Sequence, residues 1–163
     1  FSTAKAINYL HKNNVVHRDI KPDNILVDSK LNVKLSDFSL VAEVKNDQFT
    51  KTEGNLYFYS PELCQGKKSF DPKPVDIWQL GVTFYTLIFL ELPIMPKNKS
   101  NTMELLELIK VGKINYSLND NYKHYSKELI NVLKLCLEID PLKRINSEDL
   151  IKMDYFNIEL NKS

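Results

Sequence analysis

Apolar residues divide the first part of the chain into one helical and two extended stretches. Over residues 1–13 they recur at helical spacing, at Ala4, Ile7 and Leu10, which predicts an opening helix. The apolar triplets 25–27 and 33–35 are separated by the polar turn DSKLN, which predicts a small β-hairpin. Residues 37–61 show weak periodicity, and a loop of that length in a compact domain is usually functional or disordered.

The longest apolar stretch lies directly after Pro74. Residues 75–92 are apolar on nearly every face of a helix, which predicts a central helix that is buried on all sides. Its uncharged run, Ile77–Leu90, has 14 residues, whereas a membrane-spanning helix needs about 20. We therefore expect a buried core helix and no membrane span.

The rest of the chain is predicted to be helical. Residues 102–111 form a short helix, and Ser126 is placed to cap a second one. That second helix carries one apolar stripe, formed by Leu129, Val132, Leu133, Cys136 and Leu137. Asn146 and Asp149 resemble a further capping pair. The predicted fold class is therefore mainly α with a small β-hairpin region.

The amino-acid composition indicates a soluble globular protein. A chain of 163 residues with 43% hydrophobic and 26% charged residues is typical of one soluble globular domain. Lys and Arg number 22 against 21 Asp and Glu, so net charge predicts neither a nucleic-acid partner nor an anionic membrane surface.

The cysteines and the first residues of the chain indicate the cellular compartment of the protein and whether the chain is a fragment. Cys64 and Cys136 match no zinc or redox spacing, which favours two unpaired thiols in a reducing compartment. The first residues contain no apolar stretch of signal-peptide length. We expect a cytoplasmic protein, with the nucleus as the alternative. Because the chain begins inside an amphipathic helix, we also expect a fragment that lacks an upstream part.

The charged octet HRDIKPDN, residues 17–24, is the strongest motif. Together with Asp37-Phe38, thirteen residues after Asn24, it resembles the catalytic loop and the metal-binding motif of protein kinases. Three later features continue this resemblance. They are Ser60-Pro61-Glu62 for the A-P-E motif, Asp76-Ile77-Trp78 with Gly81 for the D-x-W-x-x-G helix, and Arg144 for the arginine that pairs with the A-P-E glutamate. The resemblance covers nearly the whole chain, as the C-terminal lobe of a kinase domain.

The resemblance assigns chemistry to five residues. It implies that Asp19 accepts the proton of the substrate hydroxyl and that Lys21 contacts the transferring phosphate of ATP. It implies that Asn24 and Asp37 hold Mg²⁺ as hard oxygen ligands. Leu26 would lie under the adenine ring. Lys21, two residues after Asp19, is the form that serine/threonine kinases carry.

Five further residues receive structural roles from the resemblance. His17 and Phe38 would stack in an apolar spine and act as core residues. Glu62 and Arg144 would form a partly buried ion pair, whose separation costs about 3 to 5 kcal/mol. Asp76, inside an apolar helix, needs a buried partner, which the family supplies from the catalytic-loop backbone.

Residues 39–59 correspond to the kinase activation segment. Thr50 and Thr52 lie where many kinases are phosphorylated, and a phosphate there could pair with Arg18 and order the segment. The alternative is that both are surface threonines of a mobile loop.

Two residues depart from the family pattern. Ser39 stands where the family has glycine, so its backbone could restrict the swing of Asp37. Asn55 follows Gly54 where the family has a threonine that bridges Asp19 and Lys21, and its amide can make similar hydrogen bonds.

The residues also support a finer placement and a rival function. The stretch from Gly54 to Ile94 looks most like the calcium/calmodulin-dependent kinases and their upstream kinase kinases, which implies calmodulin or an upstream kinase as partners besides the protein substrate. This chain contains no glycine-rich phosphate loop or paired strand lysine. We therefore expect the isolated chain to bind ATP poorly and to be inactive. Because the catalytic side chains expected in this half are all present, we expect the intact protein to be a signalling serine/threonine kinase. The alternative is a pseudokinase-like binding module.

Overall fold

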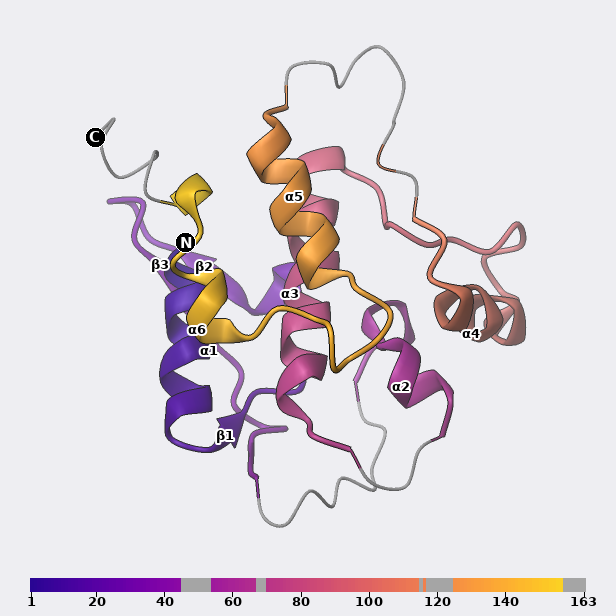
Figure 1. Cartoon of the computed structure of the whole chain (residues 1–163), viewed down its shortest axis with the longest axis horizontal. Coiled ribbons are helices and arrows are strands. Elements are labelled where there is room, and N and C mark those ends of the chain that lie inside the picture. Colours follow the sequence, from indigo (N-terminus) through magenta and orange to yellow (C-terminus); the bar gives the residue numbers. More distant parts are fainter. Residues whose placement is uncertain (45–53, 67–69, 115, 117–124, 157–163) are drawn as a thin grey trace.

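The described part of the chain is mainly helical, with two small antiparallel sheets (Figure 1). The computed structural model describes residues 1–44, 54–66, 70–114, 116 and 125–156. The helices are α1 (Ser2–Lys12), α2 (Pro61–Cys64), α3 (Lys73–Phe89), α4 (Thr102–Val111), α5 (Lys127–Cys136) and α6 (Ser147–Leu150), with the 3₁₀ turns η1 (Pro22–Asn24) and η2 (Leu56–Phe58). The strands are β1 (Val15–Val16), β2 (Ile25–Val27), β3 (Val33–Leu35) and β4 (Ala42–Glu43). The predicted fold class is confirmed.

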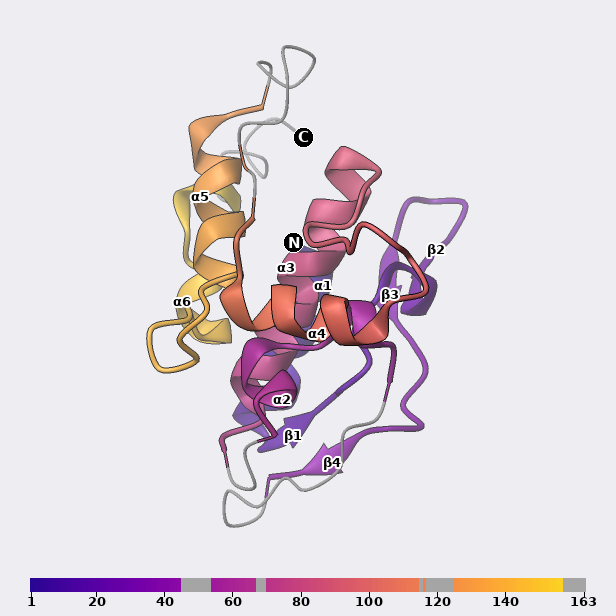
Figure 2. The same ribbon diagram turned by 90° about the vertical axis from the view of Figure 1, so that its right-hand side faces the viewer.

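Helix α3 is the central element, as its apolar sequence predicts. It contacts α1, α5, η1 and η2, and Figures 1 and 2 show it running between α1 on one side and α2 and α4 on the other. Pro74 lies in its first turn, where a missing N–H costs nothing. The helix ends at Phe89, three residues earlier than the apolar pattern predicts, because Leu90 adopts a left-handed φ of 56°.

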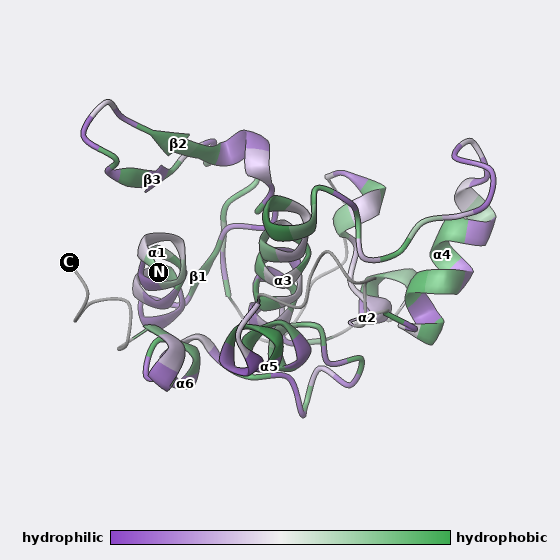
Figure 3. Ribbon diagram, turned by 90° about the horizontal axis from the view of Figure 1, so that it is seen from above, coloured by the Kyte–Doolittle hydropathy of each residue, from purple (hydrophilic) through white to green (hydrophobic). Residues whose placement is uncertain are grey.

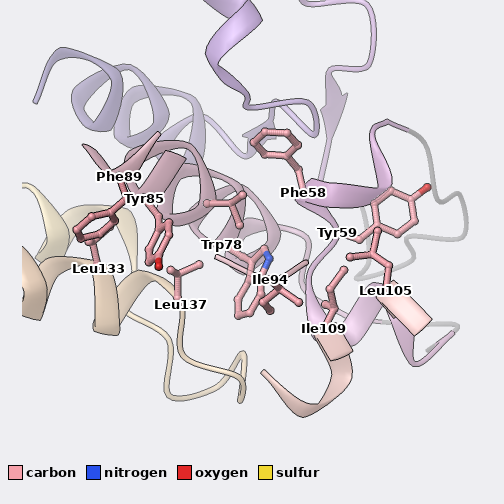
Figure 4. Packing of buried hydrophobic residues seen from close by; sticks show 11 residues of the cluster. Phe58, Tyr59, Trp78, Tyr85, Phe89, Ile94, Leu105, Ile109, Leu133 and Leu137 are labelled. Carbon is pink, nitrogen blue, oxygen red and sulfur yellow. The ribbon is translucent and has the colours of Figure 1, made fainter. Parts of the chain in front are cut away.

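Two hydrophobic clusters pack against opposite faces of α3. Trp78, Tyr85 and Phe89 belong to the first cluster, which α4 and α5 complete (Figure 4). Ile77 and Leu80 belong to the second, which joins α3 to α1, α5 and α6. A helix that is apolar on nearly every side is therefore buried from both sides.

The β2–β3 hairpin forms where the sequence predicts it. Ile25 pairs with Leu35 and Val27 with Val33, and β3 contacts α1, so the hairpin lies beside that helix at one edge of the molecule (Figure 3). A second antiparallel pair, β1–β4, joins Val15 to Glu43. The apolar pattern did not predict this pair, because strands of two residues are too short to show an alternation.

The predicted caps are present. The Ser126 hydroxyl accepts the N–H of Leu129 at 3.1 Å, and the Asn146 carbonyl oxygen accepts the N–H of Asp149 at 2.8 Å. These bonds satisfy N–H groups in the first turns of α5 and α6. No described helix is long and apolar enough to cross a lipid bilayer.

Both cysteines are free thiols in the structure. Burial is the main cause that raises the pKa of Cys64 and the pKa of Cys136, each to about 12. A thiol with so high a pKa stays protonated at neutral pH and is a poor nucleophile. The prediction of two unpaired cysteines is confirmed.

Helix α3 packs tightly against the end of α5 at Gly81. A β-carbon there would lie 2.8 Å from Cβ of Cys136 and 2.9 Å from the side chain of Leu137. We predict that Gly81→Ala lowers the free energy of unfolding by about 1 to 3 kcal/mol, since the extra methyl group overpacks the contact. Helix propensity alone predicts the opposite sign, a gain of about 1 kcal/mol. Chemical denaturation decides between the two, and a more stable variant would contradict the close packing.

Candidate active site

Three predicted catalytic side chains meet in the loop between β1 and β2. The Lys21 ammonium lies 2.6 Å from Oδ2 of Asp19, and the Asn24 amide nitrogen donates to that same oxygen at 3.0 Å. The Asn24 amide also donates to the backbone carbonyl of Asp19 at 2.7 Å. Asp19 is buried, so its carboxylate is held by hydrogen bonds to ionised and polar partners rather than by water.

The backbone of this loop is held by Asp76 of α3, as predicted. One carboxylate oxygen accepts the N–H of Arg18 at 2.8 Å, and the other accepts the N–H of His17 at 2.9 Å. His11 of α1 donates its Nε2–H to the same second oxygen at 2.9 Å. Arg18 has a φ of 74°, a left-handed conformation that costs free energy in a residue with a side chain. The bonds to Asp76 stabilise that conformation.

Two further residues of α3 hold the loop, and the sequence prediction missed them. The Gln79 amide oxygen accepts the N–H of Ile20 at 3.1 Å, and its nitrogen donates to the carbonyl of Arg18 at 2.9 Å. The Thr83 hydroxyl donates to the carbonyl of Ile20 at 3.3 Å. A signal was present, since Asp76, Gln79 and Thr83 form a polar stripe at helical spacing on an otherwise apolar helix.

The β2–β3 hairpin brings Asn24 and Asp37 to the same end of the hairpin. Ser36 donates both its N–H, at 2.9 Å, and its hydroxyl, at 3.0 Å, to the carbonyl of Asn24. His17 donates its Nε2–H to the carbonyl of Ser36 at 3.0 Å. Asp37 follows directly, so antiparallel pairing places it beside the catalytic loop.

Asp37 is solvent-exposed and is bonded to Ser39. Its Oδ1 accepts the Ser39 hydroxyl at 2.6 Å and the Ser39 N–H at 3.2 Å. These two bonds, assisted by the charges of Lys21 and His17, lower the pKa of Asp37 below its ordinary value. The positive φ, 58°, falls at Asp37 and not at Ser39. Ser39 therefore constrains Asp37 through its hydroxyl, not through the backbone strain that the sequence led us to expect.

His17 and Phe38 contact each other as the resemblance implies. Their ring centroids are 5.2 Å apart in an edge-to-face arrangement. His17 is fully buried, but Phe38 is 53% exposed, which corrects the expectation that both are core residues, because no described residue covers the outer face of Phe38. Leu26, predicted to lie under adenine, is 56% exposed on β2.

Glu62 and Arg144 form the predicted ion pair, and it is fully buried rather than partly buried. The two guanidinium nitrogens lie 2.7 and 2.9 Å from the two carboxylate oxygens, in a bidentate arrangement. Arg144 also donates to the carbonyls of Pro74 and Glu138 at 2.8 Å each. The pair thus ties α2 to the start of α3 and to the loop after α5.

Gly54 lies beside Asp19, and Asn55 follows it in the chain. A β-carbon at Gly54 would stand 3.3 Å from Oδ1 of Asp19, and its φ is 102°, which favours glycine. The Asn55 amide oxygen accepts the N–H of Tyr57 at 3.1 Å and caps η2. The sequence predicted instead that Asn55 bridges Asp19 and Lys21. Its short side chain bonds to the nearby backbone of Tyr57. Thr50 and Thr52 lie outside the described residues.

The residues at the hairpin end fit a magnesium ion. Both recorded side-chain bonds of Asn24 are donated by its nitrogen, which leaves its amide oxygen available as a ligand. Asp37 adds an exposed carboxylate with a lowered pKa. The described residues contain no group of three or more His, Cys, Asp or Glu side chains that could hold a metal. Two oxygen ligands suffice, since Mg²⁺ is usually held by one or two protein oxygens together with phosphates and water.

This chain belongs to the protein kinase domain family, whose model matches residues 1–156. It is 38% identical over 159 residues to the serine/threonine-protein kinase ppk34 of Schizosaccharomyces pombe, covering 96% of this chain and 42% of that protein. It is 38% identical over 156 residues to the carbon catabolite-derepressing protein kinase of Secale cereale, covering 95% of this chain and 29% of that protein. It is 35% identical over 155 residues to the SNF1-related protein kinase catalytic subunit alpha KIN12 of Arabidopsis thaliana, covering 94% of this chain and 29% of that protein. The chain thus spans less than half the length of these curated relatives.

The buried ion pair leads to a stability prediction. Arg144→Met leaves the Glu62 carboxylate buried without its cation, so we predict a loss of about 3 to 5 kcal/mol in the free energy of unfolding. The double variant Glu62→Gln/Arg144→Met removes both charges and should lose less than the single variant. Urea denaturation of the wild type and of both variants measures this difference. A double variant less stable than Arg144→Met would contradict the assignment of the loss to an uncompensated charge.

Proposed function

We propose that the protein to which this chain belongs is a serine/threonine protein kinase that transfers the γ-phosphate of ATP to protein hydroxyl groups. The observation that carries the proposal is the cluster around Asp19, whose carboxylate lies 2.6 Å from the Lys21 ammonium and 3.0 Å from the Asn24 amide nitrogen. The names of the relatives support the same reaction, since one is named as a serine/threonine-protein kinase and the other two as protein kinases.

Each residue of the cluster has a distinct task. Asp19 accepts the proton of the attacking serine or threonine hydroxyl and orients its oxygen. Lys21 offsets negative charge on the transferring phosphate, a role that its contact with Asp19, the residue that orients the attacking oxygen, supports. Asn24 and Asp37 offer the oxygen ligands that would hold Mg²⁺. Bound Mg²⁺ and ATP would supply the phosphate to be transferred and the cation that screens its charge.

Finer assignments rest on sequence resemblance. The stretch around α3 looks like the calcium/calmodulin-dependent kinase kinases, from which we infer calmodulin and an upstream kinase as candidate partners, whereas the names of the relatives include SNF1-related kinases. A role in intracellular signalling, in the cytoplasm or the nucleus, follows from the same resemblance and from the unpaired cysteines.

The role of Asp19 is tested by its isosteric amide variant. Asp19→Asn in the whole protein should lower magnesium-dependent phosphate transfer to a generic Ser/Thr substrate by at least about 100-fold, since the proton acceptor is lost. Asp154→Asn is the matched control, because Asp154 is exposed outside the catalytic loop and the same chemical change there should leave transfer unchanged. Equal transfer by the wild type and Asp19→Asn would contradict the proposal. No transfer by a folded wild type would favour the pseudokinase-like binding module.

The activation-segment hypothesis concerns Thr50 and Thr52. We expect phosphorylation there to raise phosphate transfer, because Arg18, whose guanidinium also donates to the carbonyl of Leu40 at 3.2 Å, provides a cation near the segment. Mass spectrometry of the active protein, with transfer rates of Thr50→Ala and Thr52→Ala, checks this. A fully active protein without phosphate at either threonine would show that they are ordinary surface residues.

A further inference from the structure

Ser39 occupies both acceptor directions of one oxygen of Asp37. The hydroxyl of Ser39 lies 2.6 Å from Oδ1, and the N–H of Ser39 lies 3.2 Å from that oxygen. A carboxylate oxygen offers about two lone-pair directions. Both directions of Oδ1 are therefore used by one neighbouring residue, whereas no described residue donates a recorded bond to Oδ2.

Nearly any residue at position 39 could donate the backbone N–H bond to Asp37, but only a residue with a hydroxyl group could donate the second bond. Every residue except proline has an N–H, so glycine at this position would leave one direction of Oδ1 free. The short distance of the hydroxyl bond is typical of a hydrogen bond to an ionised carboxylate, which is stronger than one between neutral groups. A cation that needs Oδ1 must first displace this hydroxyl.

We propose that Ser39 is a specificity-determining residue that makes Asp37 a one-oxygen ligand and thereby selects Mg²⁺ over Ca²⁺. This inference rests on the proposed function, in which Asp37 holds the metal of the nucleotide. Mg²⁺ requires octahedral coordination and accepts single carboxylate oxygens together with water and phosphate. Ca²⁺ takes six to eight oxygens and often binds both oxygens of one carboxylate. Blocking Oδ1 therefore disfavours Ca²⁺ more than Mg²⁺.

Substitutions at this position isolate the hydroxyl. Ser39 is solvent-exposed and does not have a positive φ, so Ser39→Ala and Ser39→Gly remove the hydroxyl without a cavity or backbone strain. Ser39→Thr keeps the hydroxyl and is the matched control. Ser39→Ala and Ser39→Gly differ in backbone freedom, but both leave one lone-pair direction of Oδ1 without a donor. A change in cation preference that both variants share is therefore caused by the loss of the hydroxyl.

The test is calorimetric binding of ADP to the whole protein, measured once in excess Mg²⁺ and once in excess Ca²⁺. The ratio of the Ca²⁺ dissociation constant to the Mg²⁺ dissociation constant should fall about tenfold in Ser39→Ala and Ser39→Gly, and stay at the wild-type value in Ser39→Thr. An unchanged ratio in either variant without a hydroxyl, or a fallen ratio in Ser39→Thr, overturns the inference and leaves the proposed function intact. A folded wild type that binds ADP with neither cation contradicts the proposed function, and the inference with it.

Discussion

The carboxylate of Asp76 is the interaction on which the arrangement of the active site depends. It lies in the middle of the molecule, with no exposed surface, on a helix that is otherwise apolar. A buried carboxylate without partners would be strongly destabilising. Here it accepts three hydrogen bonds, from the backbone of His17 and Arg18 and from the ring of His11. The need to satisfy this charge draws the catalytic loop against α3, which joins the stability of the core to the geometry of the site.

The backbone conformation of the catalytic loop would not be stable without its contacts to α3. Arg18 is left-handed, and such a conformation persists only where the surroundings impose it. Asp76 bonds its N–H and Gln79 bonds its carbonyl, so both sides of the strained residue are held by one helix. Asp19 follows directly, and its position relative to Lys21 and Asn24 depends on this anchoring. The packing of α3 against α5 at Gly81 in turn keeps the anchoring helix in place.

The sequence predicted those parts of the fold that depend on the spacing of apolar and polar residues. Helices α1, α3, α4, α5 and α6, the hairpin and the caps at Ser126 and Asn146 follow from local periodicity and side-chain chemistry. The motif around Asp19 is recognisable because its characteristic residues lie close together in the sequence. Helix α2 was not predicted, because four residues are too few to show a helical period. The roles of Gln79 and Thr83 were missed, since their bonds reach a loop about sixty residues away and no local rule reports such a partner. The β1–β4 pair was missed because two residues carry no period.

The sequence also did not predict which of several possible hydrogen-bond partners a polar side chain binds. Asn55 was expected to bridge Asp19 and Lys21 but bonds to Tyr57, and Ser39 adds a hydroxyl bond where only a backbone restriction was expected. In both residues a short polar side chain prefers a local partner within two residues, because such a bond orders few additional rotatable groups. Resemblance to a family predicts where a side chain lies, but the balance between local and long-range hydrogen bonds decides what it does there.

In the proposed function, the two aspartates of the site have opposite physical requirements, since Asp19 would receive a substrate and Asp37 would receive a cation. Asp19 must keep one orientation while it waits for a substrate, and burial with bonds to Lys21 and Asn24 provides that order. Asp37 must admit a hydrated cation, so it has to stay exposed, and packing cannot order it. A hydroxyl two residues along the chain orders it instead, without excluding water from the free oxygen. In the metal-selection proposal, the Ser39 hydroxyl therefore has two effects that glycine would lack, because it holds the carboxylate in place and also limits how many of its oxygens a metal can use.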